Sequence, residues 1–600
     1  MKKIFSLLII VLLSSFLFKG FSQEALKSTE EEYYDMLSLS GLVKRSFLNY
    51  RTLSDSKWVF TEDVTTDIES SDSELHHPWQ NNNLGTTYTL FTLDKEKLNF
   101  YERGVNNSIN IKIYGPEWYN SYNTDAPWGG NDGALWQGRG YNTSFTAGVR
   151  AEMFGFDITC KPQVSFSQNK DFEIMPSKYG NGYGYFWGAC DAPQRFGDSS
   201  FWTFDWGDTE IRYSWHAFTV GFGTESIWLG PAHENALLYS NNAASFPKID
   251  FGLKRTNFII PIPKPMHTIQ QFKLPKSDRN FDFYNLDIGE LEFRIWIGKL
   301  KESDYFDTNP DNDDRQLSGW TLSYSPSFLK GFTIGFNKTL SCYWEDKYWR
   351  YYLNPFFKGN VVKTNDEKHG EDQKASFNFE WLLEESQFDF YAEIGVDDYT
   401  SKGMKLYEYA RFPFHTITYT VGLKKGIDFE RNKNLRGIIN FEWNCTEASQ
   451  DYQMWPNSGY NFGFHYQIRQ GWTNKGQWLG SSIGYGGNNQ YLSFTLFSPH
   501  GYEKLYIGRN NPDNNYIWSK CVEGSTAYNS TRYFTAFKAN LYTGIQSLWY
   551  VIPDLSIKAE FMYDLLINPL YNPGLSPNGA YREYTYINNF KFGLTVKYEF

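Results

Sequence analysis

The residues best suited to chemistry are aromatic and polar side chains set in stretches rich in Asn, Asp, Gly and Tyr. A sugar ring has an apolar C–H face that an aromatic ring covers, and a rim of hydroxyls that carboxylates, amides and guanidinium groups bind. Two sets of this kind predict a carbohydrate site: Trp118, Asn120, Asn123, Asn131, Asp132, Trp136 and Arg139, or Trp228, Asn241 and Asn242. The structural alternative is that Asn pairs form turns and that Trp residues anchor strand ends.

Motifs that resemble catalytic or metal sites lack their required context. Gly480–Gly484 matches G-x-S-x-G, but no helix is predicted after it, as a nucleophile elbow needs. Asp307–Asp314 resembles a calcium loop without the Gly at its sixth position or the bidentate Glu at its twelfth. The sequence therefore predicts a protein that is not an enzyme, with no catalytic residue, no metal site and no cofactor.

Five cysteines are scattered along the chain without C-x-x-C spacing, which argues against a zinc site. They are Cys160, Cys190, Cys342, Cys445 and Cys521. An odd number leaves at least one thiol unpaired, and a Cys160–Cys190 bridge is left open.

The last strand indicates the fold that must position these residues. From Phe590 to Phe600 every even position is apolar, and the odd positions are polar or small. Side chains alternate between the two faces of a strand, so one face is apolar and the other polar. A closing strand of this kind, ending on an aromatic residue, is typical of a bacterial outer-membrane β-barrel.

The amino terminus predicts export. Lys2 and Lys3 precede an apolar run from Ile4 to Phe18, and small residues follow at Gly20 and Ser22. This run is shorter than the about 20 residues of a membrane-spanning helix, so we interpret residues 1–22 as a signal peptide.

Composition favours a barrel and disfavours nucleic-acid binding. Aromatic residues make up 19% of the chain and its mean hydropathy is −0.54, which suits a wet lumen with an apolar outer face and aromatic girdles. Without the three lysines of the signal peptide the net charge is −14, whereas a nucleic-acid surface is basic.

Alternating segments from residue 108 onward are joined by connections that are short and long in turn. Five short turns are predicted at Met153–Gly155, His216–Ala217, Pro326–Gly331, Glu384–Ser386 and Pro553–Asp554. Long connections are predicted at roughly 163–208, 224–288, 300–318, 341–374, 396–412, 445–475 and 500–530. Outer-membrane barrels have short periplasmic turns and long extracellular loops, whereas a soluble β-sandwich does not explain this regularity.

The segment before the barrel is predicted to be periplasmic, helical or irregular, and to pack under or into the barrel. Ser28 can cap a helix with Glu31 in capping-box spacing, and Gly41 can end it. Tyr33, Met36 and Leu37 form an apolar stripe, while Glu30–Glu32 and the Tyr33-Tyr34 pair are read as helix surface. The predicted division is 1–22 signal peptide, 23–107 periplasmic segment and 108–600 all-β transmembrane barrel.

One region resembles a known family. It contains Trp228-Leu229-Gly230-Pro231, then Ser240-Asn241-Asn242-Ala243 with Pro247, and a strand from Gly289 to Leu300. These residues resemble the Wzi family of capsule-assembly outer-membrane proteins, as do Met36–Val43 and Tyr114–Gly140. The chain departs from the family by having Leu229 where a second Trp often stands, and by longer loops.

The resemblance implies a barrel of about 18 strands and a surface lectin that anchors exported capsular polysaccharide. Implied partners are the polysaccharide, outer-membrane lipid and a polysaccharide export channel, with the protein itself a monomer in the Gram-negative outer membrane. Alternatives are a sugar or general porin and, less favoured, an outer-membrane hydrolase acting through Ser482. The 222–231 motif has a structural reading too, as a segment that folds inward and constricts the pore.

Overall fold

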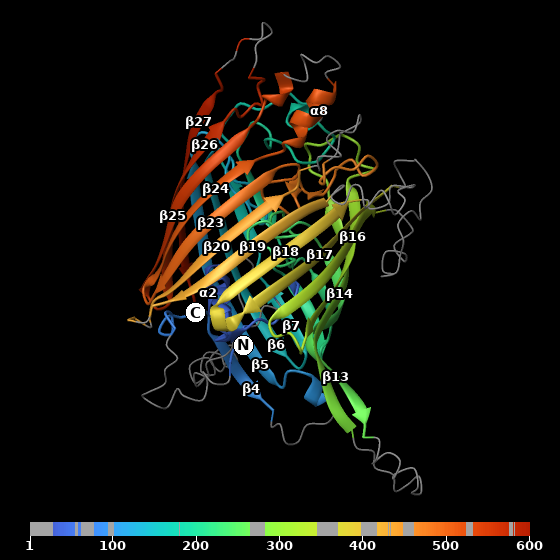
Figure 1. Ribbon diagram of the computed structural model, residues 1–600, viewed down its shortest axis with the longest axis vertical. Coiled ribbons are helices and arrows are strands. Elements are labelled where there is room, and N and C mark those ends of the chain that lie inside the picture. The colour runs from blue at the N-terminus through green and yellow to red at the C-terminus, as the bar shows by residue number, and fades with distance from the viewer. Residues whose placement is uncertain are drawn as a thin grey trace, which may run out of the picture.

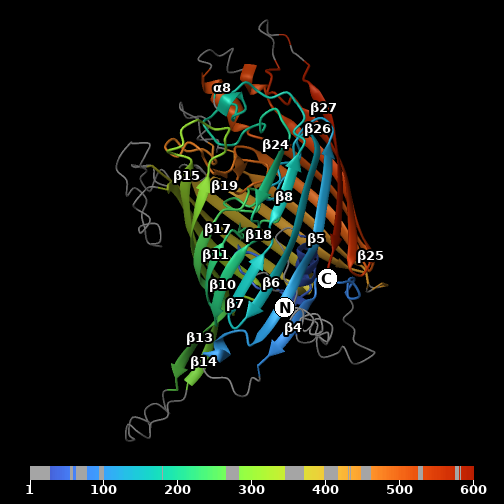
Figure 2. The same ribbon diagram turned by 180° about the vertical axis from the view of Figure 1, so that it is seen from behind.

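A computed structural model shows a closed antiparallel β-barrel with eighteen strands counted over the described residues (Figures 1 and 2). These residues are 28–53, 58–61, 77–93, 101–178, 180–264, 283–344, 370–397, 417–429, 431–432, 434–447, 461–523, 532–574, 580 and 583–600. The barrel closes where the last strand pairs with the first, from Glu117 opposite Lys597 to Asn123 opposite Lys591. The predicted fold class is confirmed.

The first half of the barrel contains two interrupted strands. Its strands are β5 (Ser108–Asn123), β6 (Gly140–Met153), β7 (Phe156–Cys160) continued by β8 (Gln163–Ser167), β9 (Phe201–Asp205) continued by β10 (Glu210–Trp215), β11 (Phe218–Gly223), β13 (Lys248–Pro263), β14 (Phe283–Lys301), β15 (Asp314–Pro326) and β16 (Phe332–Tyr343). The second half consists of β17 (Glu371–Leu383), β18 (Phe388–Asp397), β19 (Ile417–Asp428), β20 (Arg436–Cys445), β23 (Asn488–Ser498), β24 (Gly501–Asn511), β25 (Ala539–Ile552), β26 (Leu555–Ile567) and β27 (Tyr586–Tyr598).

Alternation along β27 confirms the reading of the last strand. Phe592 and Leu594 point outward and are 50% and 45% exposed, whereas Asn589 and Lys591 point inward and are buried. The outer face is therefore apolar and the inner face polar, as a barrel in a membrane requires. Over the described part of the chain, every helix is too short or too polar to cross a bilayer.

The five predicted short turns all occur where expected, and they lie at one end of the barrel. Strand β6 ends at Met153 and β7 begins at Phe156, and β25 and β26 meet at Pro553-Asp554. Helix α2 (Thr29–Leu39) and the carboxyl end lie toward this end, while helix α8 (Asn515–Glu523) lies among the long connections at the other (Figure 1). Short turns mark the periplasmic end and long loops the extracellular end.

The predicted long connection at 224–288 is right for residues 224–247, which join β11 to β13, and wrong for the remainder. The remainder holds β13 and the start of β14, which meet at the short-turn end and project beyond the barrel (Figures 1 and 2). Phe258, Ile259, Ile260 and Ile262 are all exposed. Apolar residues of β13 and β14 occupy both faces of the hairpin. This part of the sequence therefore lacks the alternation by which strands are recognised.

Helix α2 begins and ends at the predicted residues and lies inside the barrel, one of the two places predicted for it. The Ser28 hydroxyl accepts a hydrogen bond from the Glu31 amide at 3.0 Å, and Gly41 follows the helix with a φ of 70°. Most of its expected surface is buried: Tyr33 is fully buried, Glu30 and Glu31 are 2% and 4% exposed, and Glu32 is partly buried. That expectation is corrected, because the sequence of one helix does not show the lysines that face it from the barrel wall.

Those lysines come from three separate strands and pair with the acidic side chains of α2. The ion pairs are Asp35–Lys424 (2.6 Å), Glu32–Lys504 (3.0 Å) and Glu30–Lys597 (2.8 Å), from β19, β24 and β27 respectively. Burying an unpaired charge is costly, so charged side chains removed from water are paired with an opposite charge in this way. The predicted boundary between residues 23–107 and the barrel stays a prediction, and the predicted signal peptide lies outside the described residues.

Carboxylates on the wall fasten two further segments inside the lumen. Glu292 of β14 accepts the backbone N–H groups of residues 48–50, at 2.8–3.0 Å. Glu442 of β20 accepts those of residues 233–235, at 2.7–3.0 Å. These bonds satisfy backbone groups that have left the barrel sheet, so the inserted chain can pass through the interior without unpaired donors.

The inserted segments build an apolar core within the lumen. Strand β12 (Trp228–Leu229) pairs with β2 (Tyr50–Arg51), so the 222–231 motif folds inward as its structural reading predicted. A buried cluster gathers around this pairing, made of Tyr50, Ile227, Leu229, Leu238, Tyr239, Ala243, Phe246, Trp296, Leu300, Leu317, Phe462, Trp472, Leu479 and Tyr485. The barrel is thus a filled cylinder rather than an empty pore.

We expect Glu442→Ala to loosen the inserted segment without unfolding the barrel. The change removes the acceptor of one buried and two partly buried N–H groups, and an unsatisfied buried group costs about 1–3 kcal/mol. Amide exchange of His233–Asn235 measured by mass spectrometry should accelerate about tenfold or more. Glu503→Ala, which removes an exposed carboxylate from β24, is the matched control and should leave this exchange unchanged. Equal protection in both variants would contradict the fastening role of Glu442.

Candidate functional site

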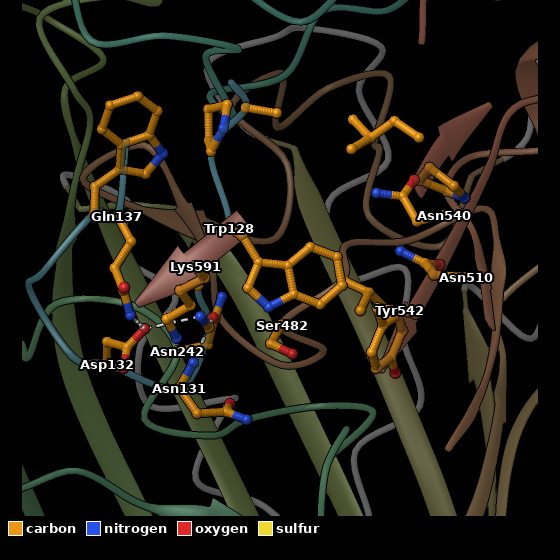
Figure 3. A pocket seen from close by; sticks show the side chains of 18 of the residues that line it. Trp128, Asn131, Asp132, Gln137, Asn242, Ser482, Asn510, Asn540, Tyr542 and Lys591 are labelled. Atoms are coloured by element: carbon orange, nitrogen blue, oxygen red, sulfur yellow. Dashed lines mark hydrogen bonds between the residues drawn. The ribbon is translucent and has the colours of Figure 1, made fainter. Parts of the chain in front are cut away.

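A cavity of about 880 Å³ lies along the wall formed by β23–β27, on one side of the filled lumen (Figure 3). It reaches from Thr29 and Glu32 of α2 to the loop residues Pro512 and Tyr571 near the extracellular end. Along β24 its lining runs from Tyr502 to Asn510, a span of about 26 Å at the usual rise of a strand. This length exceeds a single sugar ring several-fold.

Two reciprocal tyrosine–glycine pairs shape this wall. Tyr506 of β24 lies opposite Gly544 of β25, and Gly508 lies opposite Tyr542. A Cβ added at Gly508 would come within 2.1 Å of the Tyr542 ring, and one at Gly544 within 2.4 Å of the Tyr506 ring. Each ring therefore lies flat against the neighbouring strand instead of projecting inward, which leaves the space beside the wall open.

Trp128 faces this wall from the loop between β5 and β6. Its ring centroid lies 4.8 Å from that of Tyr542, tilted by 55°, and the side chain is partly exposed to the cavity (Figure 3). The Asn123 amide holds the loop by donating to the carbonyls of Trp128 (3.1 Å) and Gly138 (3.1 Å). An aromatic ring presented on a fastened loop is suited to the apolar face of a sugar.

The two predicted sets of site residues meet inside the lumen. The Asn131 amide N–H donates to Asn242 Oδ1 at 3.0 Å, and the Gly133 N–H donates to the Asn241 carbonyl at 2.9 Å. Both bonds join the β5–β6 loop to the inserted segment that carries the 222–231 motif. Parts of the two sets that the sequence offered as alternatives therefore lie next to each other.

Five of the eight principal candidates line the cavity: Asn131, Asp132, Trp136, Arg139 and Asn242. The side chains of four of these five make hydrogen bonds within the protein, and Asn131 Nδ2 donates to the Glu234 carbonyl at 2.9 Å. Asn242 donates to the Trp478 carbonyl at 2.9 Å besides accepting from Asn131, and Arg139 donates to the Thr124 carbonyl at 2.9 Å. They hold the loops in place, whereas Asn131 Oδ1 has no protein hydrogen-bond partner among the described residues.

The other three principal candidates lie away from the cavity. Trp118 points outward from β5 and is 52% exposed, and Trp228 is fully buried with its indole N–H donating to the Ala232 carbonyl at 2.8 Å. Asn241 lies beside Asn242 but does not line the cavity. Of the two further residues, Asn123 clamps the loop, and Asn120 accepts from the Tyr141 hydroxyl at 2.5 Å.

Asp132 is the most enclosed acidic group of the loop. Gln137 donates to its carboxylate at 2.6 Å and the Gly130 N–H donates at 2.8 Å. Burial raises the pKa of Asp132, an effect that the nearby Lys591 opposes by its charge. Lys591 itself pairs with Glu560 at 3.0 Å, so most of the charge on this side of the cavity is balanced within the protein.

Several lining residues were not found by sequence reasoning: Trp128, Tyr491, Tyr506, Asn510, Lys538, Asn540 and Tyr542. Most of them lie on strands, where an inward-facing polar residue is expected simply because the lumen is polar. One signal was available, since Tyr-x-Gly occurs at both Tyr506–Gly508 and Tyr542–Gly544 on consecutive strands. Only the register of β24 against β25 shows that each Tyr falls opposite the other's Gly.

The structure does not assemble a catalytic site around Ser482. Its hydroxyl donates to Asn235 Oδ1 at 3.0 Å, and an amide oxygen is not a general base. The motif is followed by β23 rather than by a helix. Across the described residues no group of three or more His, Cys, Asp or Glu side chains could hold a metal ion, and all five cysteines are free thiols.

Comparison with known proteins places the chain in a family. Residues 121–500 match the family model described as capsule assembly protein Wzi, which covers more than half of the chain. The chain belongs to the Wzi family. That family consists of assembly proteins rather than enzymes, in line with the prediction made from the motifs, and this Wzi-family barrel is a protein of the Gram-negative outer membrane.

Solved structures of outer-membrane barrels are also similar in part. Wzi of Escherichia coli, described as an outer membrane protein involved in group 1 capsule assembly and a carbohydrate-binding β-barrel, shares 10% identity over 81% of this chain and 85% of its own, with a TM-score of 0.46. OccAB1 of Acinetobacter baumannii shares 12% identity over 81% and 96%, with a TM-score of 0.33. No curated protein matches the chain in sequence.

We expect Trp228→Ala to destabilise the Wzi-family barrel much more than Trp128→Ala. Truncating a fully buried Trp costs about 3–5 kcal/mol, whereas Trp128 is only partly enclosed. The temperature at which the folded form disappears in heat-modifiable gel migration should drop clearly for Trp228→Ala alone. A comparable drop for both would mean that Trp128 is a core residue and not available to a ligand.

Proposed function

We propose that this Wzi-family barrel binds exported polysaccharide in the cavity between β23–β27 and the β5–β6 loop, and so holds the polymer at the cell surface. The observation that carries the proposal is the lining itself. A long cavity combines a partly exposed Trp, flat tyrosine rings and amide side chains, the groups that recognise sugars. The carbohydrate binding stated for the E. coli relative and the capsule-assembly family support it.

The proposed binding residues follow from their positions. Trp128 covers the apolar face of a sugar, while Asn131 and Asp132 bind hydroxyls from the loop side. Trp136 closes the cavity beside Phe196, at 5.1 Å between ring centroids. Arg139, Asn241 and Asn242 keep the loops together, and Trp118 and Trp228 have no contact with the ligand.

Anchoring follows from many weak contacts acting together. A polymer repeats the same unit, so one chain can occupy the cavities of many barrels at once. Avidity then exceeds the affinity of a single site, because each further binding event is intramolecular. Retention of a polymer at the surface therefore does not require tight binding of one oligosaccharide.

We expect Trp128→Ala to weaken binding of the host's purified surface polysaccharide to the detergent-solubilised barrel by about three- to tenfold. Trp118→Ala is the matched control, because Trp118 points toward lipid from the strand that precedes the same loop. Cells carrying only Trp128→Ala should release more polysaccharide into the medium than Trp118→Ala cells. Equal binding and equal retention in the two variants would contradict the proposed site, and a barrel that binds no surface polysaccharide would contradict the function.

We expect Gly508→Ala to reduce binding without a change at any residue that touches the sugar. The added methyl group takes the space of the Tyr542 ring, which must swing into the cavity. Gly593→Ala is the matched control on the same wall. Its added Cβ would come no closer than 3.1 Å to Glu560, so little has to move. Affinity for the polysaccharide, measured by titration, should fall for Gly508→Ala and stay close to wild type for Gly593→Ala. The reverse order would show that the flat tyrosines do not define the cavity.

A further inference from the structure

A row of asparagines crosses the upper part of the cavity wall. Asn489 of β23 lies directly opposite Asn510 of β24, which in turn lies opposite Asn540 of β25. All three line the cavity, and Asn510 and Asn540 appear side by side next to Tyr542 in Figure 3. Three neighbouring strands thus present amides at the same level.

Asn510 and Asn540 have unused hydrogen-bonding capacity. Asn510 is 7% exposed and Asn540 8% exposed, and the Oδ1 atom of each lacks a hydrogen-bond partner among the described residues. Asn489 and Asn540 also donate, to the Tyr542 hydroxyl at 3.1 Å and to Asp564 at 3.2 Å. A buried amide oxygen without a partner is costly, so these two oxygens are acceptors prepared for hydroxyl donors of a ligand.

Lys538 stands at the end of this row. It immediately precedes β25 and shares the inward face with Asn540 and Tyr542, because alternate residues of a strand point the same way. Its backbone position is fixed, since the Asn511 amide donates to the Lys538 carbonyl at 2.8 Å and the Asn568 amide to the Phe537 carbonyl at 2.7 Å. The ammonium is therefore held at the rim of the cavity.

The Lys538 ammonium differs from those of Lys504 and Lys591, two of the lysines lower in the cavity. Lys504 and Lys591 are each paired with a glutamate at 3.0 Å, whereas within the described part of the chain no carboxylate lies within 4.0 Å of Lys538. The Lys538 ammonium lies over the face of the Tyr571 ring, 5.6 Å from the ring centroid. An enclosed cation without an ion-pair partner is suited to an anionic ligand.

We propose that Asn510, Asn540 and Lys538 form a subsite for an acidic sugar unit, in which the two amide oxygens accept hydroxyl hydrogens and the Lys538 ammonium binds the negatively charged substituent. This inference rests on the proposed function and names the class of polysaccharide that the cavity takes. The charged substituent is a carboxylate, sulfate or phosphate, which share the oxygen acceptors that an ammonium binds.

The electrostatics of Lys538 agree with this assignment. Burial lowers the pKa of the Lys538 ammonium to about 8, and the longer-range charges of Asp564 and Asp513 oppose that effect. Asp513 is a weak counter-charge, because burial raises the pKa of its carboxyl to about 7. An anion bound beside Lys538 supplies the partner that the protein does not, and so favours the charged form of the lysine.

The test uses the full barrel in detergent and the host's purified surface polysaccharide in three forms. One is native, one has its carboxylates reduced to alcohols, and one has its sulfate and phosphate esters removed. We expect Lys538→Met to lower the affinity for native polymer by at least about tenfold, as loss of a charge-assisted hydrogen bond does. The wild type should show a similar loss toward whichever treated form has lost the recognised charge, and Lys538→Met should show no further loss there.

Controls separate the subsite from folding and from net charge. Lys538→Arg should retain most of the affinity, and Asn510→Ala should weaken binding of native and treated polymers alike. Lys330→Met removes the same charge from an exposed turn at the opposite end of the barrel and should have no effect. Heat-modifiable migration should match the wild type in every variant.

The outcomes also distinguish this inference from the proposed function. If the wild type binds native and both treated forms equally, or if Lys538→Met binds native polymer like the wild type, the acidic subsite is refuted and polysaccharide binding stands. If the wild type binds none of the three forms, the proposed function itself fails.

Discussion

Half of every barrel strand faces inward, and each polar or charged group placed there must find a partner away from bulk water. This requirement organises the interior of the protein. Lys424, Lys504 and Lys597 on the wall pair with the acids of α2, and Glu292 and Glu442 accept the backbone N–H groups of inserted segments. These wall side chains need partners, and the chain segments that fill the lumen supply them.

The cavity that we propose binds polysaccharide is the space that this filling leaves open. On most sides the inserted segments pack against the wall in an apolar core, but beside β23–β27 two tyrosine rings lie flat over glycines of the neighbouring strand. Hydrogen bonds of Asn131 and Gly133 to Asn242 and Asn241 fasten the β5–β6 loop to the inserted segment. These bonds set how closely the loop can approach the β23–β27 wall. A rigid groove results, and a preorganised site loses little entropy when a polymer binds.

The Trp228–Pro231 motif, one of the segments by which the chain resembles the Wzi family, helps to build the interior. Trp228 and Leu229 are fully buried and pair with Tyr50 and Arg51, so this motif fixes how the lumen is filled. The side chains that we propose contact a ligand lie on the β5–β6 loop, within another segment of that resemblance, and on β24 and β25.

The sequence by itself determined the barrel, its orientation and five of its short turns. Alternation from Phe590 to Phe600 depends on nearest neighbours along the chain, and so do the cap at Ser28 and the turn at Pro553-Asp554. It also supplied Asn131, Asp132 and Trp136 as candidates for the site. It missed the projecting β13–β14 hairpin, because apolar residues on both of its faces show no alternation.

Only the tertiary structure decided which inward residues meet. Whether Glu30 is surface or core depends on Lys597, which is far away in the chain, and whether Tyr542 lies flat depends on the register that puts Gly508 opposite it. Trp118 and Trp228 have the same residue type as Trp128, yet one faces lipid and the other is enclosed. Residue type and spacing describe what a side chain can do, but ring closure and strand register determine what it faces.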